Sequence, residues 1–203
     1  MSGATTAVAE IPISERGPSP RKVIVGYGFW LFLLSDIILF SALFAAYAVL
    51  SGRTAGGPGG VQLFHRDSVL AETGCLLASS FTCALMSLAI EVRRRGLMVI
   101  GAVLTLALGA AFLGLEVTEF AGMIARGAGP DRSAFLSAFF ALVGMHGLHV
   151  SIGLCWLVSM VAQVFTLGWR PMVVDRLACF SLFWHALDIV WIGVFTIVYL
   201  GAR

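Results

Sequence analysis

The sequence has few charged residues, which make up only 12% of its 203 positions. Soluble domains carry about 25% charged residues and about 45–50% apolar ones. In this chain 59% of the residues are hydrophobic, and the mean hydropathy is +0.96. A water-facing surface needs more charged residues than this. Most of the surface must therefore face lipid or other apolar protein. The small net charge of +2 argues against a nucleic-acid partner.

The cysteines show no metal-binding or disulfide pattern. The four cysteines, Cys75, Cys83, Cys155 and Cys179, lie inside apolar stretches and form no C-x-x-C pair. Zinc sites and disulfide frameworks both need characteristic cysteine spacings. We therefore interpret the four residues as small buried apolar side chains, and we expect no cofactor or metal bound by this chain.

Five apolar stretches are long enough to cross a membrane. A helix needs about 20 apolar residues to span a hydrocarbon core of ~30 Å, and it satisfies its own backbone in lipid. The stretches cover about 26–50, 69–90, 97–125, 134–166 and 177–200. We therefore predict an all-α membrane protein whose residues 23–203 form one bundle of five transmembrane helices.

The first 22 residues are polar and small, and the apolar run that follows is too long for a signal peptide. We expect a disordered cytoplasmic tail over 1–22, followed by an uncleaved first span. Basic residues favour the cytoplasmic side. A cytoplasmic N-terminus puts eight Lys and Arg residues inside and five outside, which predicts a periplasmic C-terminus. Arg93, Arg94 and Arg95 are the firmest anchor, and we expect them to attract anionic lipid headgroups at about 1 kcal/mol each.

Ionisable residues inside these spans are the informative ones, because each costs ~2.5–3.5 kcal/mol or more at the bilayer centre. Six of them are candidate buried polar or interface residues: Asp36, Glu119, His146, His149, His185 and Asp188. Asp36 and Asp188 fall near mid-membrane. Glu119 is grouped with Glu72 and Glu116 near the outer boundary, where a long side chain can reach the headgroups.

Three interpretations of these residues compete. His149 and His185 could be axial ligands of a haem. Asp36 and Asp188 could be the titrating groups of a stand-alone proton-coupled transporter, although the sequence has no internal repeat. In the third interpretation, which we favour, the polar residues satisfy one another and help dock the bundle onto a partner. We expect His149 or His146 to hold Asp36, at or near that partner.

Three sequence segments resemble a known family. The fourth span contains GMHGLHV at 144–150, and the fifth contains FWHALDIVW at 183–191. These resemble the HG-x-H-V and W-H-x-x-D-x-V-W signatures of subunit III of haem-copper terminal oxidases. The segment GFWLFLLSD at 28–36 resembles the one that carries the family's buried carboxylate, and Glu119-Phe120 matches its Glu-aromatic pair. The resemblance extends from about residue 23 to the C-terminus.

Two features are similar to one branch of this family. The segment GPDRSAFLSAFFALV at 129–143 is similar to subunit III of cytochrome o-type ubiquinol oxidases. Many cytochrome c oxidase versions have seven helices and a His pair in a helix that corresponds to the second span. This chain has five predicted spans, and Ser87 and Leu88 stand at those positions.

The resemblance implies a non-catalytic subunit in the inner membrane of a bacterium, crossing it several times. Haem b, haem o or a, and copper would belong to subunit I of the complex, which oxidises ubiquinol, reduces oxygen to water and translocates protons. Subunit I would be the main partner, alongside subunits II and IV and phospholipids. The alternatives within this architecture are subunit III of a cytochrome c oxidase and the corresponding subunit of a nitric oxide reductase.

Overall fold

The computed structural model describes residues 21–56 and 66–201, and the tail expected over 1–22 lies outside them except for its last two residues. Five helices in the described part are long and apolar enough to cross a membrane. They are α1 (Arg21–Leu50), α3 (Arg66–Glu91), α4 (Arg95–Ala125), α5 (Ala134–Leu167) and α6 (Pro171–Val194), with α6 continued by the π-helical segment η2 (Phe195–Leu200). The predicted all-α architecture with five candidate transmembrane helices is confirmed.

Four of the five helices begin earlier than the hydropathy pattern indicated, and the difference is largest for α1 and α6. α1 starts at Arg21, and α6 starts at Pro171 rather than near residue 177. Proline has no N–H to lose in a first helical turn and its φ is preset, so Pro171 is a favourable starting residue. Asp175 and Arg176 then lie in the second turn of α6. Hydropathy locates the apolar part of a helix, whereas the helix itself extends beyond it at polar ends.

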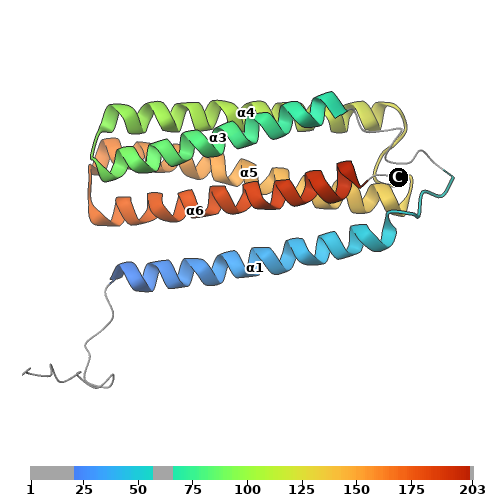
Figure 1. Cartoon of the computed structure of the whole chain (residues 1–203), viewed down its shortest axis with the longest axis horizontal. Coiled ribbons are helices and arrows are strands. Elements are labelled where there is room, and N and C mark those ends of the chain that lie inside the picture. The colour runs from blue at the N-terminus through green and yellow to red at the C-terminus, as the bar shows by residue number, and fades with distance from the viewer. Residues whose placement is uncertain (1–20, 57–65, 202–203) are drawn as a thin grey trace, which may run out of the picture.

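The helices lie side by side with their long axes roughly aligned (Figure 1). α3 packs mainly on α4, α5 on α6, and α6 on α3. α1 lies along one side of this group and packs on α5 and α6. Only 11% of the residues in the most apolar window of α1 are buried, compared with 50% for α6. α6 is therefore the central helix, and most of α1 faces outward.

Aromatic side chains fill the centre of the bundle. Trp184 and Trp191 of α6 are almost fully buried, as are Phe112 of α4 and Phe180 of α6. The rings of Phe112 and Trp191 meet edge to face at 4.7 Å between centroids. Helices in lipid are held by close packing and interhelical hydrogen bonds rather than by exclusion of water. Edge-to-face contacts of this kind add to that packing.

Glycines allow two of the closest helix contacts. A Cβ on Gly101 of α4 would lie 2.9 Å from the Cβ of Met86 of α3, and 3.1 Å from its Cα. A Cβ on Gly153 of α5 would lie 2.9 Å from the ring of Trp184. At Gly101 a backbone would have to move, because the nearest atoms include the main chain of α3.

We predict that Gly101→Ala destabilises the protein by about 1–3 kcal/mol, as overpacking does elsewhere. Gly114→Ala in the same helix is the matched control, because a Cβ there meets nothing within 4 Å. Thermal unfolding in detergent would measure both variants. Equal midpoints for the two would show that the α3–α4 contact is not tight at Gly101.

Candidate functional site

Polar side chains join α3 to α6 along the length of the bundle. On each of the two helices the bonded residues recur at spacings of about seven, which keeps them on one face of that helix. The bonds link Thr73 with Trp191 (3.1 Å), Ser79 with Trp184 (3.1 Å), Ser80 with His185 (2.6 Å) and Ser87 with Ser181 (3.0 Å). We call these eight residues the α3–α6 seam. Hydrogen bonds between membrane helices contribute about 0.6 kcal/mol each on average, and up to about 1.7.

Two of the predicted interface residues lie at this seam. The His185 ring bonds Ser80 through Nδ1. Asp188, one turn further along α6, is buried, and Ser80 interacts with its carboxyl group as well. Oδ1 of Asp188 has no hydrogen-bond partner among the described residues. Both side chains therefore face α3 inside this chain.

Asp36 and His149 form the polar contact between α1 and α5. Nε2 of His149 lies 3.9 Å from Oδ1 of Asp36, and the two side chains are 13% and 19% exposed, respectively. The ring of Phe40 packs against His149 at 5.2 Å between centroids. His149, rather than His146, is thus the residue that holds Asp36.

The hydrogen bond of His149 within its own helix determines which ring nitrogen carries a proton. Nδ1 of His149 lies 2.8 Å from the Met145 carbonyl oxygen, which can only accept, so Nδ1 carries a proton. In a neutral ring Nε2 would then present a lone pair to the Asp36 carboxyl group. At 3.9 Å, Nε2 lies beyond hydrogen-bond distance of Oδ1, so the contact is an electrostatic one between two polar groups rather than a hydrogen bond.

His146 serves as a packing residue. It is fully buried, and neither ring nitrogen has a hydrogen-bond partner among the described residues. Its ring meets Phe112 edge to face at 5.7 Å and lies 5.2 Å from the ring of Trp191. It lies on the face of α5 that packs into the aromatic core.

Three glutamates gather toward the end of the bundle where α3 begins and α4 ends. Glu72 of α3 is fully buried, Glu116 of α4 is 4% exposed, and both interact electrostatically with Glu119. The Tyr199 hydroxyl of η2 donates to Glu119 at 3.3 Å. Our expectation that Glu72 and Glu116 would reach outward to the headgroups was wrong.

Gly147 explains why Glu116 can turn inward. A Cβ at Gly147 would lie 2.5 Å from Oε1 of Glu116, so the glycine of α5 leaves the space that the carboxyl group occupies. Glu119 interacts with Tyr199 of η2, with Glu72 of α3 and electrostatically with Arg126, which directly follows α4. This carboxyl cluster joins α3, α4 and η2.

The two histidines considered as haem ligands lie against different helices. His149 faces Asp36 of α1, while His185 faces Ser80 of α3. Over residues 21–56 and 66–201, no three His, Cys, Asp or Glu side chains are grouped so that they could hold a metal ion. The polar residues thus form interhelical contacts in three places, and the haem arrangement receives no geometric support.

Comparison with known proteins identifies the family of this chain. The model of the cytochrome c oxidase subunit III family matches residues 17–202. The chain belongs to this family. It is 53% identical over 174 residues to cytochrome bo(3) ubiquinol oxidase subunit 3 of Pseudomonas aeruginosa, covering 86% of this chain and 83% of the relative. It is 46% identical over 203 residues to quinol oxidase subunit 3 of Bacillus spizizenii, covering 98% of this chain and 97% of the relative.

Membership of the subunit III family confirms the resemblance inferred from the sequence motifs. Sequence reasoning nevertheless missed the α3 half of the seam, Thr73, Ser79, Ser80 and Ser87. Three of these, at positions 73, 80 and 87, are seven residues apart in the sequence, and that spacing was the signal available. Single hydroxyl residues are common in membrane helices, so only the structure shows which of them meet a partner.

We predict a coupling free energy of about 1 kcal/mol between Ser79 and Trp184 in this subunit III family member. A double-mutant cycle with Ser79→Ala and Trp184→Phe measures it, because the cycle cancels the volume lost from the indole. Ser159 is the matched control, since it is exposed and bonds only the Cys155 carbonyl of its own helix. A Ser159→Ala cycle should give a coupling near zero. A Ser79 coupling equally near zero would contradict the role of this bond.

Proposed function

We propose that the chain is the non-catalytic subunit III of a proton-pumping ubiquinol oxidase. The observation that carries this proposal is the similarity to relatives named quinol oxidase subunit 3 over nearly the full length of both chains. Haem b, haem o or a, and copper then belong to subunit I of the complex. The role of this chain is to stabilise subunit I and to hold lipids beside it, while subunit I oxidises quinol and reduces oxygen to water.

We place the N-terminus in the cytoplasm and the C-terminus in the periplasm of a bacterial inner membrane. Arg93 and Arg94 lie in the connection between α3 and α4, Arg95 is the first residue of α4, and all three are exposed. Cytoplasmic connections carry the excess of basic residues in bacterial membrane proteins. The same arginines meet the anionic surface of the cytoplasmic leaflet in this orientation.

The outer face of α1 is the proposed docking surface for subunit I. Large apolar side chains on it are exposed, among them Tyr27 (67%), Trp30 (53%) and Ile38 (71%). The other face holds Asp36 against His149. Because α1 is fixed to the bundle by few buried residues, a partner on its outer face would also hold it in place. Subunits II and IV are then further neighbours in the complex.

A purification test decides between this function and its alternatives. We predict that the tagged chain, purified in mild detergent from its native membrane, brings down a large haem-containing subunit with the absorption spectrum of b- and o- or a-type haems. The complex should oxidise ubiquinol and not reduced cytochrome c. Cytochrome c oxidation would place the chain in the other branch of the family, and a haem-free monomer or homo-oligomer would contradict an oxidase altogether.

We propose that Asp36 fixes packing rather than delivers protons. Asp36→Asn should preserve both assembly and proton uptake, because the amide can donate to Nε2 of His149. Asp36→Leu should lower the amount of this subunit in the complex, since it removes the polar partner of His149. Quantitative mass spectrometry and proton uptake by the reconstituted complex measure the two effects.

The neighbouring Ser35→Ala is the control for both Asp36 variants, because Ser35 is exposed and bonds only its own helix. Full assembly of the Asp36→Leu variant would contradict the packing role. Lost proton uptake in a fully assembled Asp36→Asn variant would instead assign Asp36 a part in proton delivery.

A further inference from the structure

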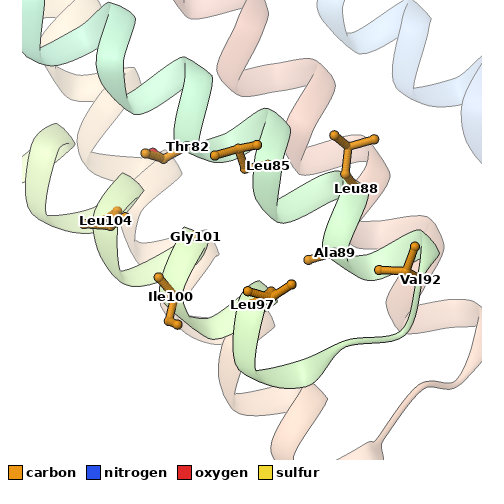
Figure 2. Close-up of a pocket in the computed structure, with 9 residues that line it drawn as sticks. All are labelled: Thr82, Leu85, Leu88, Ala89, Val92, Leu97, Ile100, Gly101 and Leu104. Atoms are coloured by element: carbon orange, nitrogen blue, oxygen red, sulfur yellow. The ribbon is translucent and has the colours of Figure 1, made fainter.

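An apolar groove runs between α3 and α4 at the end where the two helices connect. Its volume is about 310 Å³, and Figure 2 shows the side chains that line it. Val92 and Leu97 lie at the mouth, and Thr82 and Leu104 at the far end. Thr82 is the one polar side chain in the lining, and its hydroxyl bonds the Ser79 carbonyl and the Thr105 hydroxyl. The groove therefore presents a hydrocarbon surface along its whole length.

The length of the groove matches one leaflet of a bilayer. Between Thr82 and Val92, α3 advances by about 15 Å at 1.5 Å per residue. The hydrocarbon core is ~30 Å thick, so the groove extends from the helix connection to about mid-membrane. A partner helix of the same length would fill roughly 1,200 Å³, taking a diameter of ~10 Å. A helix laid on the groove would put only side chains into it, whereas an acyl chain is narrow enough to lie along it.

Three consecutive arginines stand at the mouth of the groove. Arg93, Arg94 and Arg95 directly follow Val92, and all are exposed. None of them forms a salt bridge with a carboxylate in the described part of the chain, where the one pair found joins His149 and Asp36. With the exposed Glu91 beside Val92 included, this end of the groove still carries an excess of positive charge.

The backbone of the turn does not need these side chains. Main-chain N–H groups of Arg93 and Arg94 donate to the carbonyls of Ile90 and Ala89, which closes the end of α3. Arg94 precedes the first residue of α4 and makes no side-chain capping bond. The Arg95 guanidinium lies near Gly168, on the side of the α5–α6 connection. Arg93 and Arg94 remain available for a ligand.

The groove also lies away from the proposed subunit I interface. α1 packs mainly on α5 and α6, and Figure 1 shows it on the opposite side of the bundle from α3 and α4. A partner seated on the outer face of α1 leaves the α3–α4 groove open to lipid.

We propose that this groove binds one anionic phospholipid, with an acyl chain between α3 and α4 and the phosphate at Arg93 and Arg94. The proposal deepens the lipid-holding role above by giving it a site and a lipid class, and it rests on that proposed function. The ligand is anionic because the arginines have no carboxylate partner among the described residues. An electrically neutral zwitterionic lipid would leave this charge uncompensated.

The test uses the complete complex in nanodiscs made of phosphatidylcholine with phosphatidylglycerol as the minor lipid. A phosphatidylglycerol with a photoreactive acyl chain should crosslink to residues 82–104. Native mass spectrometry should show the complex retaining phosphatidylglycerol in preference to phosphatidylcholine. Replacing all three arginines by Gln should lower this preference by roughly tenfold or more, whereas replacing all three by Lys should keep most of it.

A second pair of variants distinguishes lipid binding in the groove from a general attraction of anionic lipids to the arginines. Ile100→Trp puts a large ring into the groove from an exposed position, and it should abolish the crosslink to 82–104. Val117→Trp is its control, since Val117 is equally exposed on α4 but outside the groove. An unchanged crosslink in Ile100→Trp, or equal retention of the two lipids by the unmodified complex, would overturn the proposal.

The remaining outcomes are also decisive. A photoreactive residue at position 100 that crosslinks to another subunit instead of to lipid would show that a protein covers the groove, and would overturn the proposal. The haem spectrum of the same sample reports separately on the oxidase assignment. A missing lipid preference with normal haem content therefore counts against the site alone, whereas missing haem counts against the proposed function.

Discussion

A buried polar group in a membrane bundle is costly unless protein supplies its partner, because the hydrocarbon offers none. That constraint explains the α3–α6 seam. Each indole N–H of the two central tryptophans donates to a hydroxyl group on α3, so rings large enough to fill the core bring no unpaired donor with them. The helix with the largest buried share, α6, thus directs most of its interhelical hydrogen bonds to α3. Apolar packing and hydrogen bonding therefore stabilise the same contact, between α3 and α6. α4 and α5 pack around this pair.

α1 is attached by different means. It contributes few buried residues, and its one ion pair, within the residues described, is the 3.9 Å contact of Asp36 with His149. Apolar side chains of α1 pack beside this contact, with Phe40 against the ring of His149 and Tyr47 against Phe135 of α5. The exposed apolar face of α1 must therefore meet lipid or another protein. The relatives of this chain are named as subunits of quinol oxidases.

Sequence alone could predict the number of candidate spans, because apolar run length reflects bilayer thickness directly. It could not predict which way a side chain turns. Glu72 and Glu116 are close enough to the boundary to reach outward, yet a glycine at position 147 on another helix gives Glu116 an inward space. His146 and His149 share one face of α5 by spacing, but one packs in the aromatic core and the other meets α1. Such outcomes depend on neighbouring helices, which a single-helix pattern does not contain.

The two sides of the bundle differ in what can cover them. On the α1 side, bulky exposed residues such as Trp30 and Ile38 form a surface that another helix could pack against. On the α3–α4 side lies the apolar groove, with three exposed arginines at one end. The proposed docking surface and the proposed lipid site thus lie on different sides of the bundle. Because Gly101 holds α3 and α4 closely together at Met86, the groove beside this contact has a fixed floor. A rigid floor lowers the entropy cost of binding one chain in one position, which distinguishes such a lipid from the fluid bilayer around it.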